Sequence, residues 1–440
     1  MLYYFILGQS PKLSSAEIYS VLKSRGLNFK IVKFSHEVFL AEISGKFDAN
    51  DILDQLGGTI KIGEIIAKDD MAKIKPDLIS QLLLQSGVRS PKSGETQSLL
   101  AKSSLGAVDS GLGTKFHFGF STYRLGATSF RLPRNFGLEV KKLLKEKGVP
   151  SRLVVSKEPN LSSVTVAKNR LLKNGAEICL LADGAEIYLG KTLAVQRFGE
   201  YSKFDYGRPG RDAESGMLPP KVAKIMINLG ESKVRSPESG ENSPRSSSAL
   251  LDPFCGSGTI LQEASRLGYT NLIGSDISPK AIADTEANFN FLNQADSHIP
   301  HTTYHIPQLY TLDAKELSAK IKPQSVDTII TEPFLGPALR GGEKPEKIKA
   351  LVAELSALYL KSLAEFKKVL RPAGRVVIIF PVLQGQPSIS NQQLSAIKQL
   401  GFAPAWNLPI ELQPLLTPRG SIIYSRAGQQ TEREIFVFQV

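Results

Sequence analysis

Short apolar strands alternate with helical patterns along most of this 440-residue chain. From about residue 215 onward the alternation is regular, which predicts a parallel, doubly wound α/β sheet. The last part departs from this pattern, because residues 421–426 and 432–440 are two strand-like runs around a short polar turn. They predict an antiparallel hairpin at the end of the sheet.

Two smaller α+β blocks precede this sheet. In residues 1–85, a strand-like run at 2–7 is followed by a helical pattern at 14–23. Residues 114–198 again mix strands with helices, and the dipeptide Asp183-Gly184 joins two strand-like runs. Because this dipeptide favours a tight turn, it predicts a hairpin in the second block.

Two Ser/Gly-rich segments, residues 86–113 and 230–247, interrupt the pattern. They share a near-repeat, since residues 88–95 and 234–241 differ at one position only. Their polar composition cannot bury a core, so both are interpreted as surface insertions or linkers.

The charge balance points to an anionic partner. Lys and Arg number 54 against 42 acidic residues, a formal net charge of +12. A surplus of this size is typical of proteins that bind nucleic acid, although it also aids solubility.

Two cysteines, Cys179 and Cys255, lie far apart without metal-ligand spacing. This excludes a disulfide framework or a zinc site and favours a reducing compartment, so we expect a cytoplasmic protein. The three histidines near residues 298–305 are interpreted as loop residues, and no metal is expected. The apolar start is short and reads as a strand, and no run is long enough to cross a membrane.

The segment 250–259 carries the clearest candidate chemistry. An apolar strand ends at Asp252, and a Gly-rich turn leads into a helix; the next apolar strand ends at Asp276. Glycines allow close approach of the backbone to a ligand, and the second acid is placed for ribose hydroxyls, which predicts a nucleoside site. The turn lacks P-loop spacing and a following Lys. An acid at the first strand end suits a cationic ligand such as S-adenosylmethionine; the alternative is an ordinary strand–turn–helix.

Two further segments should reach the same edge of the sheet, because ligands in open α/β sheets bind beyond the carboxyl ends of the strands. Asp313-Ala314 follows a third strand and is placed for an adenine amine, unless Asp313 is a solvated loop acid. Residues 331–334, Thr-Glu-Pro-Phe, follow the apolar strand at 326–330, unless they are a plain strand exit.

The segment 252–259 resembles motif I of the Rossmann-like methyltransferases, in the branch that methylates amines. In that branch the stretch at 331–334 usually reads Asp or Asn, Pro, Pro, then Tyr or Phe. The resemblance implies that an acceptor at this stretch orients a base amine and that the aromatic ring stacks on the extruded base. Pro333 and Phe334 match, but Thr331 and Glu332 depart from the pattern. Glu332 either supplies the acceptor from a shifted position or marks altered or lost activity.

A second resemblance covers most of the chain outside the two insertions. The segments 206–212 (YGRPGRD) and 215–221 (SGMLPPK), with 161–164, resemble the THUMP-domain tRNA guanine-N2 methyltransferases of archaea and eukaryotes. This implies S-adenosylmethionine as cofactor and a flipped guanine of the tRNA D-arm, near position 10, as substrate. It leaves room for a small activator subunit. The implied domains are a ferredoxin-like unit (1–85), an insertion (86–113), a THUMP RNA-binding domain (114–198), a linker that begins the catalytic domain (199–229), an insertion (230–247) and a Rossmann-like methyltransferase domain (248–440).

The basic residues of the second block are candidates for phosphate contacts, or else solvated helix faces. Arg208 and Arg211 stand on a loop stiffened by Pro and Gly, which suits bidentate phosphate recognition or pairing with nearby acids. The predicted RNA-binding residues are Lys141, Lys145, Arg152, Lys157, Lys168, Arg170, Arg208 and Arg211. The predicted cofactor-binding residues are Asp252, Pro253, Phe254, Gly256, Gly258, Thr259, Asp276, Ile277, Asp313 and Ala314, and the predicted catalytic residues are Thr331, Glu332, Pro333 and Phe334.

Two rival interpretations stay open at this point. One is the same chemistry on a base of ribosomal RNA or DNA. The other is a non-catalytic tRNA-binding protein that keeps the fold and has lost the amine acceptor.

Overall fold

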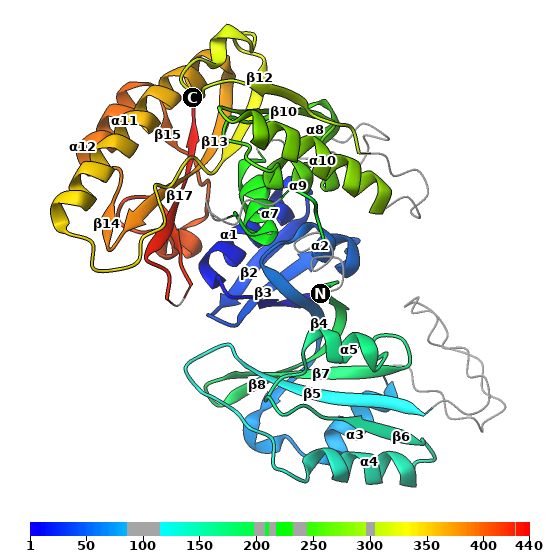
Figure 1. The fold of residues 1–440 in the computed structure, drawn as a ribbon. Helices are drawn as coiled ribbons and strands as arrows, with labels where there is room; N and C mark the ends of the chain where they lie inside the picture. Colours follow the sequence, from blue (N-terminus) through cyan, green and yellow to red (C-terminus); the bar gives the residue numbers. More distant parts are fainter. Residues whose placement is uncertain (86–114, 198–206, 211–216, 232–243, 296–303, 427) are drawn as a thin grey trace. The chain divides into compact units, whose positions relative to one another are not determined.

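The computed structural model describes residues 1–85, 115–197, 207–210, 217–231, 244–295, 304–426 and 428–440 (Figure 1). The chain forms two compact units, and each is described by itself. The first unit contains residues 1–8, 29–54 and 59–198. The second contains residues 9–28, 55–58 and 199–440.

One eight-stranded sheet runs through the first unit, in the order β2-β3-β1-β4-β8-β7-β5-β6. The first four strands pair antiparallel in the order of a split β-α-β-β-α-β motif, which is the ferredoxin-like arrangement. The two α+β blocks expected from the sequence therefore share a sheet, joined where β4 pairs with β8. The strands are β1 (Leu2–Leu7), β2 (Asn28–Phe34), β3 (Val38–Ser44), β4 (Thr59–Asp70), β5 (Phe116–Arg124), β6 (Ser151–Val154), β7 (Gly175–Asp183) and β8 (Glu186–Val195).

Helix α4 (Phe136–Glu146) shows how the sequence orients a helix in this unit. Phe136, Val140 and Leu144, spaced by four residues, are buried in a core shared with β5, β7 and β8. The lysines between them lie on the opposite, exposed face. The other helices described with this unit are α2 (Ala49–Gln55), α3 (Pro76–Gln85) and α5 (Ser163–Lys168).

A buried ion pair lies inside this sheet. The Lys61 ammonium donates to the Glu177 carboxylate at 2.5 Å and to the Leu161 carbonyl at 2.6 Å, and both charged side chains are fully buried. The hydroxyls of Ser121 and Thr192 donate to the same carboxylate. Each charge is therefore compensated by neighbours on other strands, and the pair ties the loop at Leu161 to the sheet.

Removing one half of this pair should strongly destabilise the first unit. We expect Glu177→Gln to lower the free energy of opening β5 and β7 by about 3 kcal/mol, because it leaves the Lys61 ammonium buried without a counter-charge. Hydrogen exchange followed by mass spectrometry measures this locally, with peptides of the second unit as internal control. Equal protection in wild type and variant would contradict the expectation. The double change Lys61→Met with Glu177→Leu should recover much of the loss.

The second unit contains the predicted doubly wound sheet, which is confirmed. Its order is β11-β10-β9-β12-β13-β17-β15. Strands β9 to β13 are parallel, and β17 pairs antiparallel with both β13 and β16, so the terminal hairpin is also confirmed. The strands are β9 (Ala249–Asp252), β10 (Asn271–Asp276), β11 (Gln308–Thr311), β12 (Val326–Thr331), β13 (Leu370–Leu383), β14 (Gln386–Pro387), β15 (Ala403–Pro404), β16 (Ile422–Tyr424) and β17 (Thr431–Gln439).

Helices cover both faces of this sheet (Figure 1). One face carries α7 (Pro220–Gly230), α9 (Thr259–Arg266) and α10 (Pro279–Ala295), and the other carries α11 (Pro345–Val369) and α12 (Asn391–Gln399). Helix α11 buries an apolar stripe against β12, β13 and β17. Since both faces are covered, the central strands read as continuous apolar runs rather than as alternating ones.

The described ends of the second Ser-rich segment, residues 230–231 and 244–247, hold a buried ion pair. Arg245, on the short helix α8 (Pro244–Ser247), is buried and pairs with the buried carboxylate of Glu231 at 2.7 Å. Its guanidinium also donates to Asn228, whose amide donates in turn to Glu17 on α1 (Pro11–Ser24). Composition could not show this, because the amino-acid content of a polar segment does not say which of its arginines is buried. Residues 232–243, with the near-repeat at 234–241, and residues 86–114 lie outside the described part.

Glu17 is the acceptor at the centre of this network. Its two carboxylate oxygens accept from the backbone N–H groups of Gly57 and Gly58, at 2.8 and 2.9 Å. Burial raises the pKa of Glu17 to about 7, against the effect of these hydrogen bonds. The network explains why residues 9–28 and 55–58 form one unit with the Rossmann-like sheet.

Candidate active site

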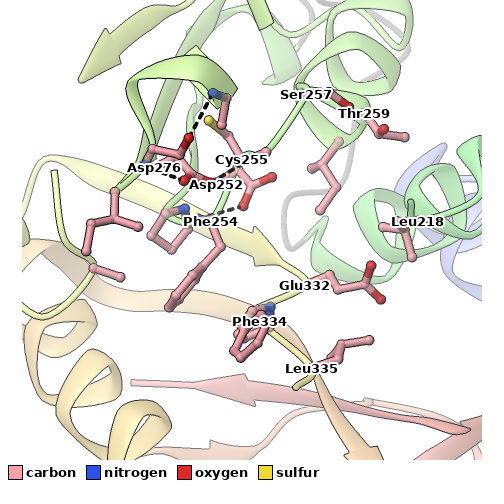
Figure 2. Close-up of a pocket in the computed structure, with 18 of the residues that line it drawn as sticks. Leu218, Asp252, Phe254, Cys255, Ser257, Thr259, Asp276, Glu332, Phe334 and Leu335 are labelled. Carbon is pink, nitrogen blue, oxygen red and sulfur yellow. Dashed lines mark hydrogen bonds between the residues drawn. The ribbon is translucent and has the colours of Figure 1, made fainter. Parts of the chain in front are cut away.

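A pocket of about 550 Å³ opens at the carboxyl ends of β9, β10 and β12, where the sequence predicted a ligand site. Figure 2 shows Asp252, Phe254, Cys255 and Asp276 on one side, with Glu332, Phe334 and Leu335 facing them. Of the predicted residues, the lining contains Asp252, Pro253, Phe254, Gly256, Thr259, Asp276, Ile277, Asp313, Ala314, Glu332, Pro333 and Phe334. Gly258 and Thr331 lie beside the pocket rather than in its lining.

The Gly-rich turn between β9 and α9 has the backbone that glycine allows. Gly256 and Gly258 have φ values of 50° and 82°, in the left-handed region. A Cβ at Gly258 would lie 2.8 Å from the Thr285 side chain on α10. The Thr285 hydroxyl donates to the Gly256 carbonyl at 2.8 Å, so α10 holds the turn from below.

Asp252 ends the central strand and is almost fully buried, with 1% of its surface exposed. Its Oδ1 accepts from the Thr331 hydroxyl at 2.8 Å and from the Phe254 backbone N–H at 3.2 Å. The pKa of Asp252 is raised to about 8, chiefly by burial and to a smaller extent by the nearby carboxylates of Asp276 and Glu332. Thr331 was predicted to be catalytic, but the structure places it under Asp252 as its hydrogen-bond partner.

Asp276 closes the opposite side of the Gly-rich turn. Its Oδ2 accepts from the Gly256 N–H at 3.0 Å and its Oδ1 from the Ser278 N–H at 2.9 Å. The carboxylate is therefore fixed at the pocket wall, next to the side chain of Ile277, which is 71% exposed. Asp313 lies two residues beyond the end of β11, lines the pocket and pairs with Lys315 at 3.1 Å.

Glu332 faces Asp252 from the end of β12 and forms an ion pair that the sequence did not reveal. Its Oε1 lies 2.6 Å from Nε of Arg433 on β17, and its Oε2 lies 3.5 Å from Nη2 of the same guanidinium. Both side chains are nearly buried, at 11% and 9% exposure. Burial raises the pKa of Glu332, and Arg433 opposes this shift.

Phe334 follows on the same segment and is half exposed at the pocket. The hydroxyl of Tyr359 on α11 donates to the Phe334 carbonyl at 2.6 Å, which fixes the backbone of the segment. A large, half-exposed ring at a pocket wall is suited to stacking on a planar ligand.

Arg208 was predicted to contact RNA, and the structure corrects this. Its side chain is 4% exposed, and its guanidinium donates to the Thr259 hydroxyl at 2.8 Å and to Met217 Sδ at 3.0 Å. It therefore supports the helix start behind the Gly-rich turn. The sequence showed the charge and the stiff loop but not the burial. Arg211 lies outside the described residues.

Asn288 on α10 fastens the loop at Gly210, and sequence reasoning missed it. Its amide accepts from the Gly210 N–H and donates to the Gly210 and Ser257 carbonyls, all within 2.9 Å. One side chain thus joins this loop to the Gly-rich turn. An Asn inside a helical pattern carries no signal of this role in sequence.

The other predicted RNA-binding residues belong to the first unit, and all are exposed. They lie on α4 and β6, on α5, and in the loops that follow β6 and α5. These residues are Lys141, Lys145, Arg152, Lys157, Lys168 and Arg170.

Within the described ranges, no group of three or more His, Cys, Asp or Glu side chains could hold a metal ion. Nor does any helix in this part of the chain have the length and apolar character of a membrane span.

Comparisons with known proteins give the pocket a family context. Residues 241–399 match the family UPF0020, described as an RMKL-like methyltransferase domain. The tRNA (guanine(10)-N2)-dimethyltransferase of Methanothermobacter thermautotrophicus is 31% identical over 161 residues, 36% of this chain and 40% of that protein. The protein with the same name from Methanocaldococcus jannaschii is 30% identical over 140 residues, 32% of this chain and 35% of its own length.

A solved structure extends the likeness of fold to the whole chain. The crystal structure of TrmN from Thermus thermophilus superposes with a TM-score of 0.50 at 16% identity and covers 100% of this chain and 99% of its own. The sequence alignments, by contrast, span less than half of the curated relatives. Residues 241–399, in the second unit, therefore match a UPF0020-type methyltransferase domain, and about a third of the chain is similar in sequence to the tRNA (guanine(10)-N2)-dimethyltransferases.

Proposed function

We propose that this protein is an S-adenosylmethionine-dependent methyltransferase that acts on the exocyclic N2 amine of a guanine in tRNA. The observation that carries the proposal is the arrangement of one pocket. A buried acid and a fixed acid, Asp252 and Asp276, flank a left-handed Gly-rich turn, and Glu332 and Phe334 face them.

The acid at the end of β9 fits a cationic cofactor. Its two hydrogen-bond donors, Thr331 and Phe254, are neutral, and its burial raises the pKa of Asp252 to about 8. A cation in the pocket would compensate this desolvated carboxylate. S-adenosylmethionine, when bound, supplies both an ammonium group and a methyl group on a sulfonium. Asp276 would hold its ribose hydroxyls, and Ile277 and Asp313 its adenine ring.

The other wall fits a flipped base. Glu332 offers carboxylate oxygens as acceptors for an amine, and the half-exposed ring of Phe334 offers a stacking surface. Orienting the amine toward the methyl group is the main work left to the protein, because the sulfonium already provides a good leaving group.

Transfer RNA is the substrate that the relatives and the charge favour. The similar proteins are named tRNA (guanine(10)-N2)-dimethyltransferases, which favours a guanine of tRNA as substrate. The exposed lysines and arginines of the first unit supply a basic surface for phosphates, in a chain of net charge +12.

The direct test is methyl transfer from labelled S-adenosylmethionine to an unmodified tRNA transcript, followed by nucleoside analysis. We expect N2-methylated guanosine from the wild type and a loss of about 100-fold or more in Glu332→Ala, because the amine loses its acceptor. Glu354→Ala, on the exposed face of α11, is the matched control and should be as active as wild type. Tight tRNA binding without any methylated product would favour the non-catalytic alternative. Methyl transfer to ribosomal RNA or DNA and none to tRNA would favour the other alternative, the same chemistry on another nucleic acid.

Cofactor binding should depend on pH through Asp252. Because the pKa of this carboxyl is about 8 in the ligand-free protein, the group is protonated at lower pH and must lose its proton to meet a cation. We expect the affinity for S-adenosylmethionine to fall about tenfold per pH unit below 8, with proton release on binding. Calorimetric titration between pH 6 and 8 measures both. Asp252→Asn should bind S-adenosylmethionine weakly, with an affinity that does not depend on pH. Asp276→Asn should also bind it weakly, but its affinity should still fall at lower pH. A pH-independent affinity in the wild type would contradict the assignment.

The basic face of α4 should contribute to RNA binding through phosphates. We expect the double change Lys141→Ala with Lys145→Ala to weaken tRNA binding and to lower the slope of log K against log salt by about 2. Filter binding at several salt concentrations measures the slope. Lys361→Ala with Lys398→Ala, on exposed helix faces of the second unit, removes the same charge. An equal change in both double variants would show a net-charge effect and no site.

A further inference from the structure

The ion pair between Glu332 and Arg433 lies one residue beyond position 331, where the amine methyltransferases that this chain resembles usually carry Asp or Asn. Arg433 is distant in sequence and lies on β17, with β13 between it and β12 in the sheet. Its guanidinium crosses to Glu332 and meets Oε1 at 2.6 Å, whereas Oε2 has only a 3.5 Å contact to Nη2. Arg433 thus binds the carboxylate mainly through Oε1, and Oε2 keeps most of its capacity to accept hydrogen bonds.

We propose that Arg433 is a positioning residue that holds Glu332 as an ionised carboxylate, so that the pocket reads the two adjacent N–H donors of guanine, at N1 and N2. This inference rests on the proposed function and goes beyond it, because it names what selects the base. On this proposal, the departure of residues 331–332 from the usual pattern sets the choice of base and does not mean that activity is lost.

The chemistry of the base edges makes the selection sharp. Guanine presents N1–H beside the N2 amine, which is two donors side by side. A carboxylate accepts at every position and donates at none, so it matches this pair. Adenine presents the N1 lone pair beside its N6 amine, and a carboxylate would then face another acceptor. A site that meets a substrate N–H with a buried acceptor rejects the analogue that lacks it.

The arginine is needed because burial works against the charge of Glu332. Glu332 is nearly buried, its charge acts on the Asp252 carboxyl across the pocket, and the Tyr359 hydroxyl on α11 is also near it. Burial raises the pKa of Glu332, and Arg433 is the neighbour that opposes this. Protonated Glu332 would carry a donor toward the donors of guanine. Since the pKa is raised, the carboxylate form is lost as pH falls, and removing Arg433 should move that loss to higher pH.

A nucleoside substitution tests the reading of the base. A tRNA carrying 2-aminopurine in place of the methylated guanosine keeps the amine on C2 but has a lone pair at N1. We expect wild-type kcat/KM to be about 100-fold lower on this substrate. In Glu332→Gln the amide can donate to N1 and accept from the amine, so the ratio of guanosine to 2-aminopurine should shrink at least about tenfold.

The arginine is tested by Arg433→Met and Arg433→Lys. The first should lower kcat and shift the acidic limb of the pH profile to higher pH, and the second should partly restore both. Arg419→Met is the matched control. It removes an ion pair to Glu434, which follows Arg433 on β17; in wild type, Nε of Arg419 lies 2.8 Å from Oε1 of Glu434. It should reduce stability and leave both the nucleoside ratio and the pH limb unchanged.

The outcomes separate the two levels of the proposal. The inference is overturned if wild type methylates guanosine but Glu332→Gln leaves the ratio of guanosine to 2-aminopurine unchanged and the Arg433 variants leave the pH limb unchanged. The proposed function would then still stand. Wild type that methylates no tRNA overturns the proposed function and this inference with it. If Arg433→Met does not fold, Glu332→Gln and Arg433→Lys decide.

Discussion

The pocket depends on one costly arrangement, a carboxylate buried at the end of the central strand. Asp252 is removed from water, and the Thr331 hydroxyl and one backbone N–H satisfy only part of its hydrogen-bonding capacity. A protein keeps such a group where a ligand supplies the missing charge. The parallel sheet makes this feasible, because it brings the ends of β9, β10 and β12 to one edge and lets neighbouring strands hold each acid.

The second acid, Glu332, is handled in the opposite way. Its counter-charge is internal, since Arg433 reaches it from the antiparallel strand β17. The carboxylate of Asp252 therefore has no cation among its hydrogen-bond donors in the described part of the chain, whereas that of Glu332 is paired with the Arg433 guanidinium. This asymmetry fits a cationic cofactor on the side of Asp252 and a neutral base on the side of Glu332. The terminal hairpin thus contributes a side chain to the site in addition to completing the sheet.

Much of this could be predicted from the sequence, because it depends on local patterns. Apolar runs that end in Asp252 and Asp276, with glycines between them, determine a strand, a left-handed turn and a helix start within thirty residues. Contacts between distant segments could not be predicted. Arg433 lies 101 residues from Glu332, and nothing in the sequence around either residue indicates that they form an ion pair. Arg208 was misjudged for a related reason, since the sequence displays a charge but not whether it is buried.

The central claim is that the Asp252 carboxylate recognises the positive charge of the cofactor. The most direct measurement is a thermodynamic cycle by calorimetry at pH 8.5, with S-adenosylmethionine and uncharged methylthioadenosine as ligands and with wild type and Asp252→Asn as proteins. We expect wild type to prefer the cationic ligand, and Asp252→Asn to lose most of that preference while it binds methylthioadenosine as well as before. The same preference in both proteins would contradict it.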